Sequence, residues 1–343
     1  MEKLISIIVP CYNSEKLLDE CFNTLKNQTI GIDNLEIIFV NDCSKDQTLK
    51  KLYEYEEQFP DSICVVDLAV NVKQGGARNI GLTYATGKYV SFVDSDDWVK
   101  LNMFEILYQK AEEYQTEIIQ APFIHARGNG KEETEACYKY GFLDGTDIWV
   151  KKGLLIGNIM TFGSQNKFYL RSFIQKNEAR FVEHRVYEEP SFVYPLFLNA
   201  ERLFILDEGL YYYRHTVQSV TGAYMREPGK LYDHPEVQLE LLKNLVKKNL
   251  VVDIYSDEIE FYFLHTYYIE TLYFSGLSRL YLGVDYFEKM QKMVLTLFPE
   301  YDNNFYLNLP ELKSSKMVMS SVNKSFTQQE LEDYCTEVVN MIK

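Results

Sequence analysis

Short apolar runs rich in β-branched residues alternate with amphipathic stretches through the first 115 residues of the chain. The alternation predicts strands at 4–9, 35–40, 63–67 and 89–93, and helices at 15–28, 48–59, 76–85 and 99–114. Strands of this kind separated by helices are typical of a parallel sheet that is covered by helices on both faces. The sequence therefore predicts an α/β fold with a Rossmann-like, mostly parallel sheet.

Polar side chains follow three of the four predicted strands. The strand ends are Pro10–Asn13, Asn41–Ser44, Asp67 and Asp94–Asp97. Ligands of doubly wound sheets bind outside the carboxyl ends of the strands. We therefore expect a site for a polar ligand along this edge of the sheet.

Three aspartates, Asp94, Asp96 and Asp97, stand directly behind the buried run "YVSFV". Mg²⁺ and Mn²⁺ prefer carboxylate oxygens and are often shared with the phosphates of a substrate. An acidic turn in solvent has the same composition, so the residues alone leave both a solvated turn and a metal site open.

The composition of the chain and the motifs that it lacks argue against several classes of function. The formal net charge of −15 argues against binding nucleic acid, which needs a basic face. The six cysteines form no C-x-x-C pair, which favours reduced, buried thiols. The G-x-G-x-x-G fingerprint is absent after the first predicted strand, which argues against a nicotinamide-dependent dehydrogenase. A membrane-spanning run and a signal-peptide pattern are also absent, so we expect a cytoplasmic protein.

The second half of the chain changes character near Gly222 and Pro228. Before this point, 130–136 predicts a solvated loop and 202–215 predicts a strand, a turn and a second strand. After it, apolar residues recur at helical spacing. We expect a domain at 1–222 and a smaller helical region at 223–343, whose role in acceptor binding, self-association or contact with the inner face of the cell membrane is left open.

Three stretches of the chain, which contain the four motifs "PCYN", "NDCS", "GGARN" and "DSDD" in this order, resemble one protein family. The stretches "SIIVPCYNSEKLLDECFNTLKNQT", "LEIIFVNDCSKDQT" and "GGARNIGLTYATGKYVSFVDSDDW" are similar to family 2 inverting glycosyltransferases, which have the GT-A fold. The resemblance is close over about the first 115 residues and looser to about residue 220. It implies metal-dependent transfer of a sugar from a UDP-sugar to a hydroxyl of a glycan or lipid-linked glycan, in bacterial cell-surface or exopolysaccharide synthesis.

The resemblance also implies roles for individual residues. It assigns the metal ion, Mn²⁺ or Mg²⁺, to Asp96, Asp97 and His215. It assigns the nucleotide-sugar to Pro10, Tyr12, Asn13, Asp42, Arg78, Asp94, Ser95 and Arg214, with Asp42 at the uracil ring. The chain departs from the family at Cys43, where glycine is frequent, and at Gly75–Gly76, ahead of the A-R-N motif.

An inverting transfer needs a carboxylate that removes the proton of the acceptor hydroxyl. "YEEPSF" resembles the family's acidic pair, with Glu189 as the expected base and Glu188 as its substitute. Pro190 suits a first helical position, which predicts Glu189 as the N-cap near the positive end of the helix dipole. An ordinary acidic cap is the alternative. Lys167 matches a recurring N-K-L-Y stretch, with a structural or an acceptor-side role.

Two other functions are carried as alternatives. A sugar nucleotidyltransferase also uses acids on an α/β sheet, but "PCYNSEK" lacks its glycine-rich basic loop. A catalytically inactive scaffold of a polysaccharide-assembly complex is the other, and the complete "DSDD" cluster argues against it.

Overall fold

The computed structural model describes residues 3–128, 130–136, 139–215, 227–251 and 253–342. The chain is divided into two compact units, Met1–Thr216 and Val217–Lys343. The boundary predicted at residue 222 lies outside the described residues. Each unit is described by itself.

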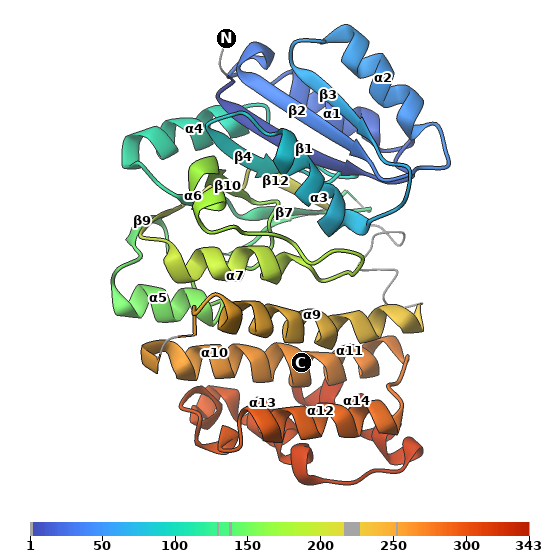
Figure 1. Ribbon diagram of the computed structural model, residues 1–343, viewed down its shortest axis with the longest axis vertical. Coiled ribbons are helices and arrows are strands. Elements are labelled where there is room, and N and C mark those ends of the chain that lie inside the picture. Colours follow the sequence, from blue (N-terminus) through green and yellow to red (C-terminus); the bar gives the residue numbers. More distant parts are fainter. Residues whose placement is uncertain (1–2, 129, 137–138, 216–226, 252, 343) are drawn as a thin grey trace. The chain divides into compact units, whose positions relative to one another are not determined.

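An eight-stranded sheet forms the centre of the N-terminal unit (Figure 1). Its strands are β1 (Ile5–Cys11), β2 (Leu35–Asn41), β3 (Ile63–Asp67), β4 (Tyr89–Phe92), β6 (Ile118–Gln120), β9 (Gly141–Asp144), β10 (Lys167–Leu170) and β11 (Arg202–Ile205). Their order is β3-β2-β1-β4-β10-β6-β11-β9, and β10 and β9 run antiparallel to their neighbours. The predicted, mostly parallel sheet is confirmed. The order reverses between β1 and β4, which is where ligands bind in sheets of this type.

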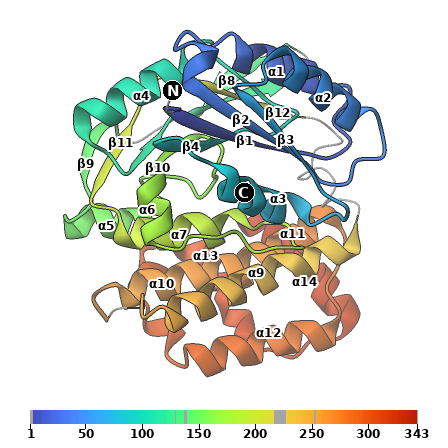
Figure 2. The same ribbon diagram turned by 45° about the horizontal axis from the view of Figure 1, so that its top comes forward.

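Helices cover both faces of this sheet (Figure 2). They are α1 (Leu18–Lys26), α2 (Thr48–Gln58), α3 (Lys73–Tyr84), α4 (Met103–Tyr114), α5 (Ile148–Leu155), α6 (Arg171–Lys176) and α7 (Glu189–Asn199). On one face Phe22 of α1 stacks on Tyr55 of α2 with ring centroids 3.7 Å apart. On the other face α3 lies so close to β1 that a Cβ at Gly81 would be 2.4 Å from Ile8 Cγ2. Every residue of β1 is buried, as expected for a strand between two helical layers.

A second, four-stranded sheet was not predicted. It contains β5 (Trp98–Val99), β7 (Phe123–Arg127), β8 (Glu132–Thr134) and β12 (Tyr211–His215), in the order β5-β12-β7-β8. Two expectations were wrong because of it. The helix expected from 99 starts at Met103, since Trp98–Val99 pairs with β12, and the loop expected at 130–136 contains β8, which pairs with β7. The two strands expected in 202–215 are present as β11 and β12, and they belong to different sheets.

The start of α3 also differs from the expectation. The helix begins at Lys73, so Gly75 and Gly76 lie inside it and not ahead of it. A Cβ at Gly75 would lie 2.4 Å from the carbonyl oxygen of Val182. Glycine is therefore required at this position for the close approach of α3 to the chain that leads into α7.

The C-terminal unit is helical, as predicted. Its helices are α9 (Pro228–Lys247), α10 (Ser256–Phe263), a π-helix (Leu264–Glu270), α11 (Thr271–Ser278), α12 (Val284–Leu297), α13 (Lys313–Met319) and α14 (Gln328–Ile342). Gly276 of α11 packs directly on the backbone of Cys335 in α14, where a Cβ would be 2.0 Å from the carbonyl oxygen. Within the part of the chain that the structure describes, no helix combines the length and apolar character needed to cross a bilayer.

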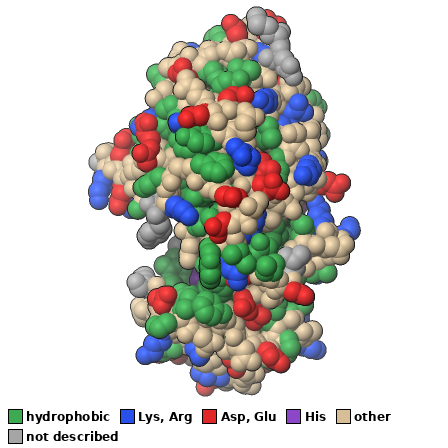
Figure 3. Space-filling view, turned by 90° about the vertical axis from the view of Figure 1, so that its left-hand side faces the viewer, with side chains coloured by type: hydrophobic (Ala, Val, Ile, Leu, Met, Phe, Trp, Pro, Cys, Tyr) green, Lys and Arg blue, Asp and Glu red, His purple; other side chains and the backbone are tan. Residues whose placement is uncertain are grey.

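Acidic and basic side chains are interspersed on the face shown in Figure 3, with hydrophobic side chains between them. This mixed pattern differs from the continuous basic stripe that binds nucleic acid.

The contact of α11 with α14 predicts the effect of a single methyl group. Gly276→Ala should lower the free energy of unfolding by about 1–3 kcal/mol, because the new Cβ overlaps a backbone atom that cannot rotate away. Gly229→Ala in α9 is the matched control, because its Cβ would meet nothing within 4 Å and alanine favours a helix. Urea unfolding followed by circular dichroism measures both; equal stability of the two variants would contradict the packing described.

Candidate active site

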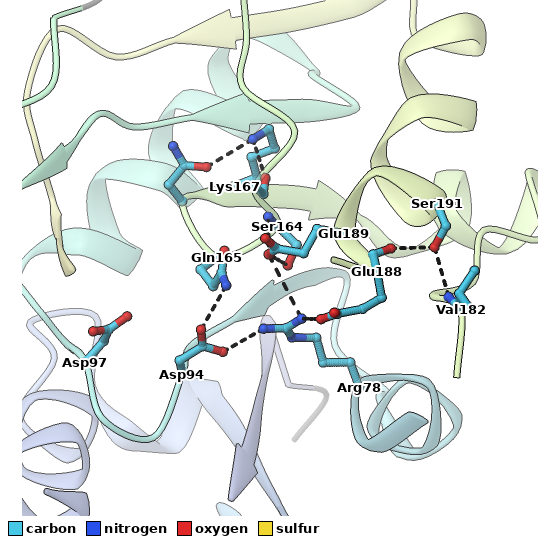
Figure 4. A network of polar contacts seen from close by, with 12 residues as sticks. Arg78, Asp94, Asp97, Ser164, Gln165, Lys167, Val182, Glu188, Glu189 and Ser191 are labelled. Carbon is cyan, nitrogen blue, oxygen red and sulfur yellow. Dashed lines mark hydrogen bonds and ion pairs between the residues drawn. The ribbon is translucent and has the colours of Figure 1, made fainter. Parts of the chain in front are cut away.

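The guanidinium of Arg78 lies fully buried between two carboxylates beside the carboxyl end of β4 (Figure 4). Its Nη2 donates to Asp94 Oδ1 at 2.7 Å and its Nη1 to Glu188 Oε1 at 2.5 Å. The guanidinium carbon lies 5.4 Å from the ring centroid of Phe181. These contacts join α3, the turn after β4 and the start of α7, so a buried charge is satisfied only when all three segments are in place.

Glu188 has no access to solvent. Burial raises the pKa of its carboxyl above the ordinary range, the charge of Arg78 opposes this change, and the charge of Glu189 adds to it. Glu188 Oε2 has no hydrogen-bond partner among the described residues. The main chain at Glu188 is held by Ser191, whose Oγ donates to its carbonyl oxygen at 2.5 Å and accepts from Val182 N at 2.9 Å.

Glu189 differs from its neighbour in exposure and partners. Its side chain is 26% exposed, and its Oε1 accepts from Ser164 N at 3.0 Å and Ser164 Oγ at 2.8 Å. Glu189 is the first residue of α7 and not the N-cap, which corrects the prediction. Glu188 takes the cap position without a side-chain capping bond, because its carboxylate is turned to Arg78.

The acidic turn after β4 separates its carboxylates. Asp94 accepts from Arg78 and, through Oδ2, from Gln165 Nε2 at 2.8 Å. Asp97 is buried; its Oδ2 accepts from the Tyr211 hydroxyl at 2.8 Å and its Oδ1 from Arg214 N at 2.7 Å. In Figure 4 Asp97 lies apart from the Arg78 cluster, which consists of Arg78 with Asp94 and Glu188. Asp97 therefore links this turn to β12 of the second sheet.

Asp96 is the third carboxylate of the turn. It is half-buried, and the described residues supply no side-chain hydrogen bond to its carboxylate oxygens. Burial, with a contribution from the charge of Asp94, raises its pKa to about 6. A carboxylate in this environment favours a cation as its partner.

The loops that follow β1 and β4 touch each other. Ser14 Oγ and Ser95 Oγ lie 2.7 Å apart, and Ser95 is buried. Asn13 joins the loop after β1 to the loop after β2, because its Oδ1 accepts from Lys45 N at 2.8 Å. The strand ends at which the sequence predicted a ligand site are thus in direct contact.

Asp42 is buried at the end of β2, and its Oδ1 accepts from Val72 N at 2.7 Å. Burial raises its pKa above the ordinary range. The next residue, Cys43, has a φ of 59°, in the left-handed region that favours glycine, the residue that the family resemblance leads one to expect here. Pro10 is buried in β1, whereas the ring of Tyr12 is 53% exposed beyond it.

Arg214 and His215 have protein partners in this structure. Arg214 Nε donates to the Asp96 carbonyl at 2.7 Å, and its guanidinium lies over the Trp98 ring, 4.3 Å from the centroid. Arg214 also forms an ion pair with Glu20. His215 Nε2 lies 2.9 Å from His125 Nδ1 on the neighbouring strand β7.

The predicted metal ligands do not form a three-residue cluster. Across the described ranges, no group of three or more His, Cys, Asp or Glu side chains is arranged to hold a metal ion. His215 is paired with His125, and both oxygens of Asp97 accept hydrogen bonds from the protein. Of the three predicted ligands, Asp96 has the carboxylate that is left for a cation.

The sequence reasoning missed Ser164, Gln165 and Tyr211. Ser164 and Gln165 precede Lys167, which the sequence did single out, and Tyr211 belongs to the predicted strand "LYYYRH". Lys167 is buried, and its Nζ donates to the Gly163 carbonyl at 2.5 Å. A structural role for Lys167, one of the two alternatives, fits these contacts.

Comparison with known proteins identifies related sequences. The model of the family described as glycosyl transferase family 2 matches residues 6–173. The glycosyltransferase GlyG of Streptococcus pneumoniae serotype 4 is 31% identical over 64% of this chain and 73% of its own length. The uncharacterized glycosyltransferase EpsJ of Bacillus subtilis strain 168 is 31% identical over 64% of each chain.

A third relative is TarS of Staphylococcus aureus strain Mu50, named as a poly(ribitol-phosphate) beta-N-acetylglucosaminyltransferase. It is 29% identical over 77% of this chain but only 44% of its own length. The chain thus spans less than two thirds of EpsJ and less than half of TarS. The crystal structure of S. aureus TarS 1–349 in complex with UDP-GlcNAc has the same fold, with a TM-score of 0.59 at 19% identity over 93% of this chain and 92% of that one.

The contacts of Arg78 predict a large loss of stability when it is replaced. Arg78→Met should lower the free energy of unfolding by about 3–5 kcal/mol, because the carboxylate of Glu188 is left buried without a counter-charge. Adding Glu188→Gln should recover part of the loss. Denaturant midpoints measure all variants, with Lys110→Met at a partly exposed position, expected to be unchanged, as the control. A wild-type midpoint for Arg78→Met would refute the assignment.

Proposed function

Because the chain belongs to glycosyl transferase family 2, as its motifs predicted, we propose that it moves a sugar from a UDP-sugar to a hydroxyl of a glycan, with inversion at the anomeric carbon. One observation carries the proposal. Asp94, Arg78 and Glu189 converge at the carboxyl end of β4, beside the point where the strand order reverses.

The donor is proposed to bind along the ends of β1, β2 and β4. Buried Asp42 and the exposed ring of Tyr12 suit a nucleoside, because one supplies a polar partner for the base and the other an apolar surface. Asp94 and Ser95 follow on the side of the sugar, and Arg78 holds Asp94 in place. The complex of TarS with UDP-GlcNAc supports a UDP-sugar as the donor.

Glu189 is proposed as the base. Its carboxylate is partly exposed, whereas that of Glu188 is buried and bonded to Arg78. Glu189 takes the proton of the acceptor hydroxyl while the hydroxyl oxygen attacks the anomeric carbon. The bond from that carbon to the phosphate oxygen breaks, and its electron pair leaves with UDP. Glu188 keeps Arg78 in position.

Asp96 fits Mn²⁺ or Mg²⁺, because its carboxylate is half-buried and carries no side-chain hydrogen bond from the described residues. Such ions are often held by one or two carboxylates together with substrate phosphates and water. When bound, the ion would neutralise charge on the departing diphosphate. Arg214 and His215 are proposed to support this turn, through Asp96 O and through the pairing of β12 with β7.

The acceptor class is proposed from the relatives. TarS is named for poly(ribitol phosphate), and a Bacillus spizizenii relative is named a poly(ribitol-phosphate) beta-glucosyltransferase. Both names support a bacterial cell-surface glycan as the acceptor. The proposed acceptor is either a free glycan or a glycan attached to a lipid.

Turnover of UDP-sugars tests the proposal. The purified protein with Mn²⁺ should release UDP from UDP-glucose, UDP-galactose or their N-acetylated forms, and poly(ribitol phosphate) should increase the rate. Nuclear magnetic resonance of the product should show a β-linkage formed from the α-linked donor. The proposal fails if the whole series yields no UDP, and pyrophosphate released from UTP and a sugar phosphate would favour the nucleotidyltransferase alternative.

Variants of the two central carboxylates should separate their roles. Glu189→Gln should lower kcat by about 10²- to 10⁴-fold, because it removes the general base. Asp96→Asn should abolish the stimulation by Mn²⁺. Glu113→Gln, on the exposed side of α4, is the control and should leave the rate unchanged. A fully active Asp96→Asn protein would contradict metal dependence. An Asp96→Ala protein that works in its pathway as well as the wild type would favour the scaffold alternative.

A further inference from the structure

The loop formed by residues 161–166 connects two carboxylates of the proposed site, those of Glu189 and Asp94. Ser164 donates twice to Glu189 Oε1, through N at 3.0 Å and Oγ at 2.8 Å. The next residue, Gln165, donates to Asp94 Oδ2 at 2.8 Å. Figure 4 shows both side chains directed from this loop toward the Arg78 cluster. Two adjacent residues therefore tie the start of α7 to the turn after β4.

The 161–166 loop is held from inside the protein. The buried Lys167 Nζ donates to the Gly163 carbonyl at 2.5 Å and to Asn166 Oδ1 at 3.0 Å. At the other end of the loop, Thr161 N donates to Gln120 Oε1 at 3.0 Å. Ser164 itself is fully buried. Its hydroxyl therefore has little freedom to leave Glu189.

The two oxygens of Glu189 have different surroundings. Oε1 accepts both bonds from Ser164 and lies 4.0 Å from Arg78 Nη1. Oε2 accepts no hydrogen bond from a described residue, and the side chain is partly exposed. An oxygen with two donors already bound is the poorer proton acceptor, so a hydroxyl that approaches Glu189 meets Oε2.

We propose that Ser164 is the positioning residue for the base: it fixes Oε1 of Glu189 and thereby assigns Oε2 as the atom that takes the acceptor's proton. The inference rests on the proposed function. In the step, the acceptor O–H bond breaks and its proton passes to Oε2, while the oxygen forms the bond to the anomeric carbon. The bond to the phosphate breaks, and its electrons leave with UDP. Through Gln165 the same loop sets the place of Asp94 relative to this proton acceptor.

Graded replacement of Ser164 tests the inference, with the UDP-sugar that the wild type turns over fastest. Ser164→Ala keeps the backbone donor and removes the hydroxyl, so kcat should fall by about 10- to 100-fold. The KM for the UDP-sugar should stay within about twofold, because Asp94 and Gln165 are untouched. Ser164→Cys, a near-isosteric but weaker donor, should have an intermediate kcat.

Thr86→Ala is the matched control. It removes a hydroxyl that donates to a carboxylate, Glu36, at 2.9 Å, just ahead of β4 and outside the site, and kcat should not change. A wild-type kcat for Ser164→Ala would overturn this inference but not the proposed function. The inference would also be overturned if Ser164→Ala raised KM as much as it lowered kcat and also lowered the unfolding temperature. Ser164 would then serve only the folding of the loop. If the wild type turns over no donor, the proposed function fails and the inference with it.

Discussion

The buried ion pairs of Arg78 are the interaction on which the rest of the site depends. A guanidinium without access to water is stable only with close counter-charges, and Arg78 receives them from Asp94 and Glu188. The two carboxylates come from segments far apart in the sequence. The helix α3 can approach them because Gly75 has no side chain to collide with Val182. One buried charge thus determines how a helix, a strand end and the start of a second helix meet.

This arrangement separates the roles of two adjacent carboxylates. Glu188 is turned inward to Arg78, and burial raises its pKa. Glu189, one residue later, is turned toward the 161–166 loop and retains contact with solvent. Successive residues at the start of a helix point in directions about 100° apart, so one can serve the interior and the other the site.

The acidic turn after β4 shows a similar division. Asp94 is bound by Arg78 and Gln165, and Asp97 by Tyr211 and the main chain of β12. Asp97 anchors the turn to the second sheet, which leaves Asp96 as the carboxylate suited to a cation. The three aspartates therefore do not act as one cluster.

The sequence by itself determined the four parallel strands of the first 93 residues, the presence of the helices that alternate with them, and the family. It did not predict β5 or the first residues of α3 and α4. The strands, the helices and the family can be predicted because the periodicity and the motifs that indicate them involve residues close together in the sequence. Arg78, Asp94, Glu188 and Glu189 could be named in advance for the same reason, since each lies in a motif.

Only the tertiary structure decided which partner each carboxylate has. Glu188 meets Arg78 across 110 positions of the chain, and β11 and β12 separate into different sheets because each pairs with distant strands. Ser164 and Gln165 carry no motif, and their contacts with Glu189 and Asp94 arise from where β10 enters the sheet. Contacts of this range depend on the packing of the whole unit, which no local pattern records.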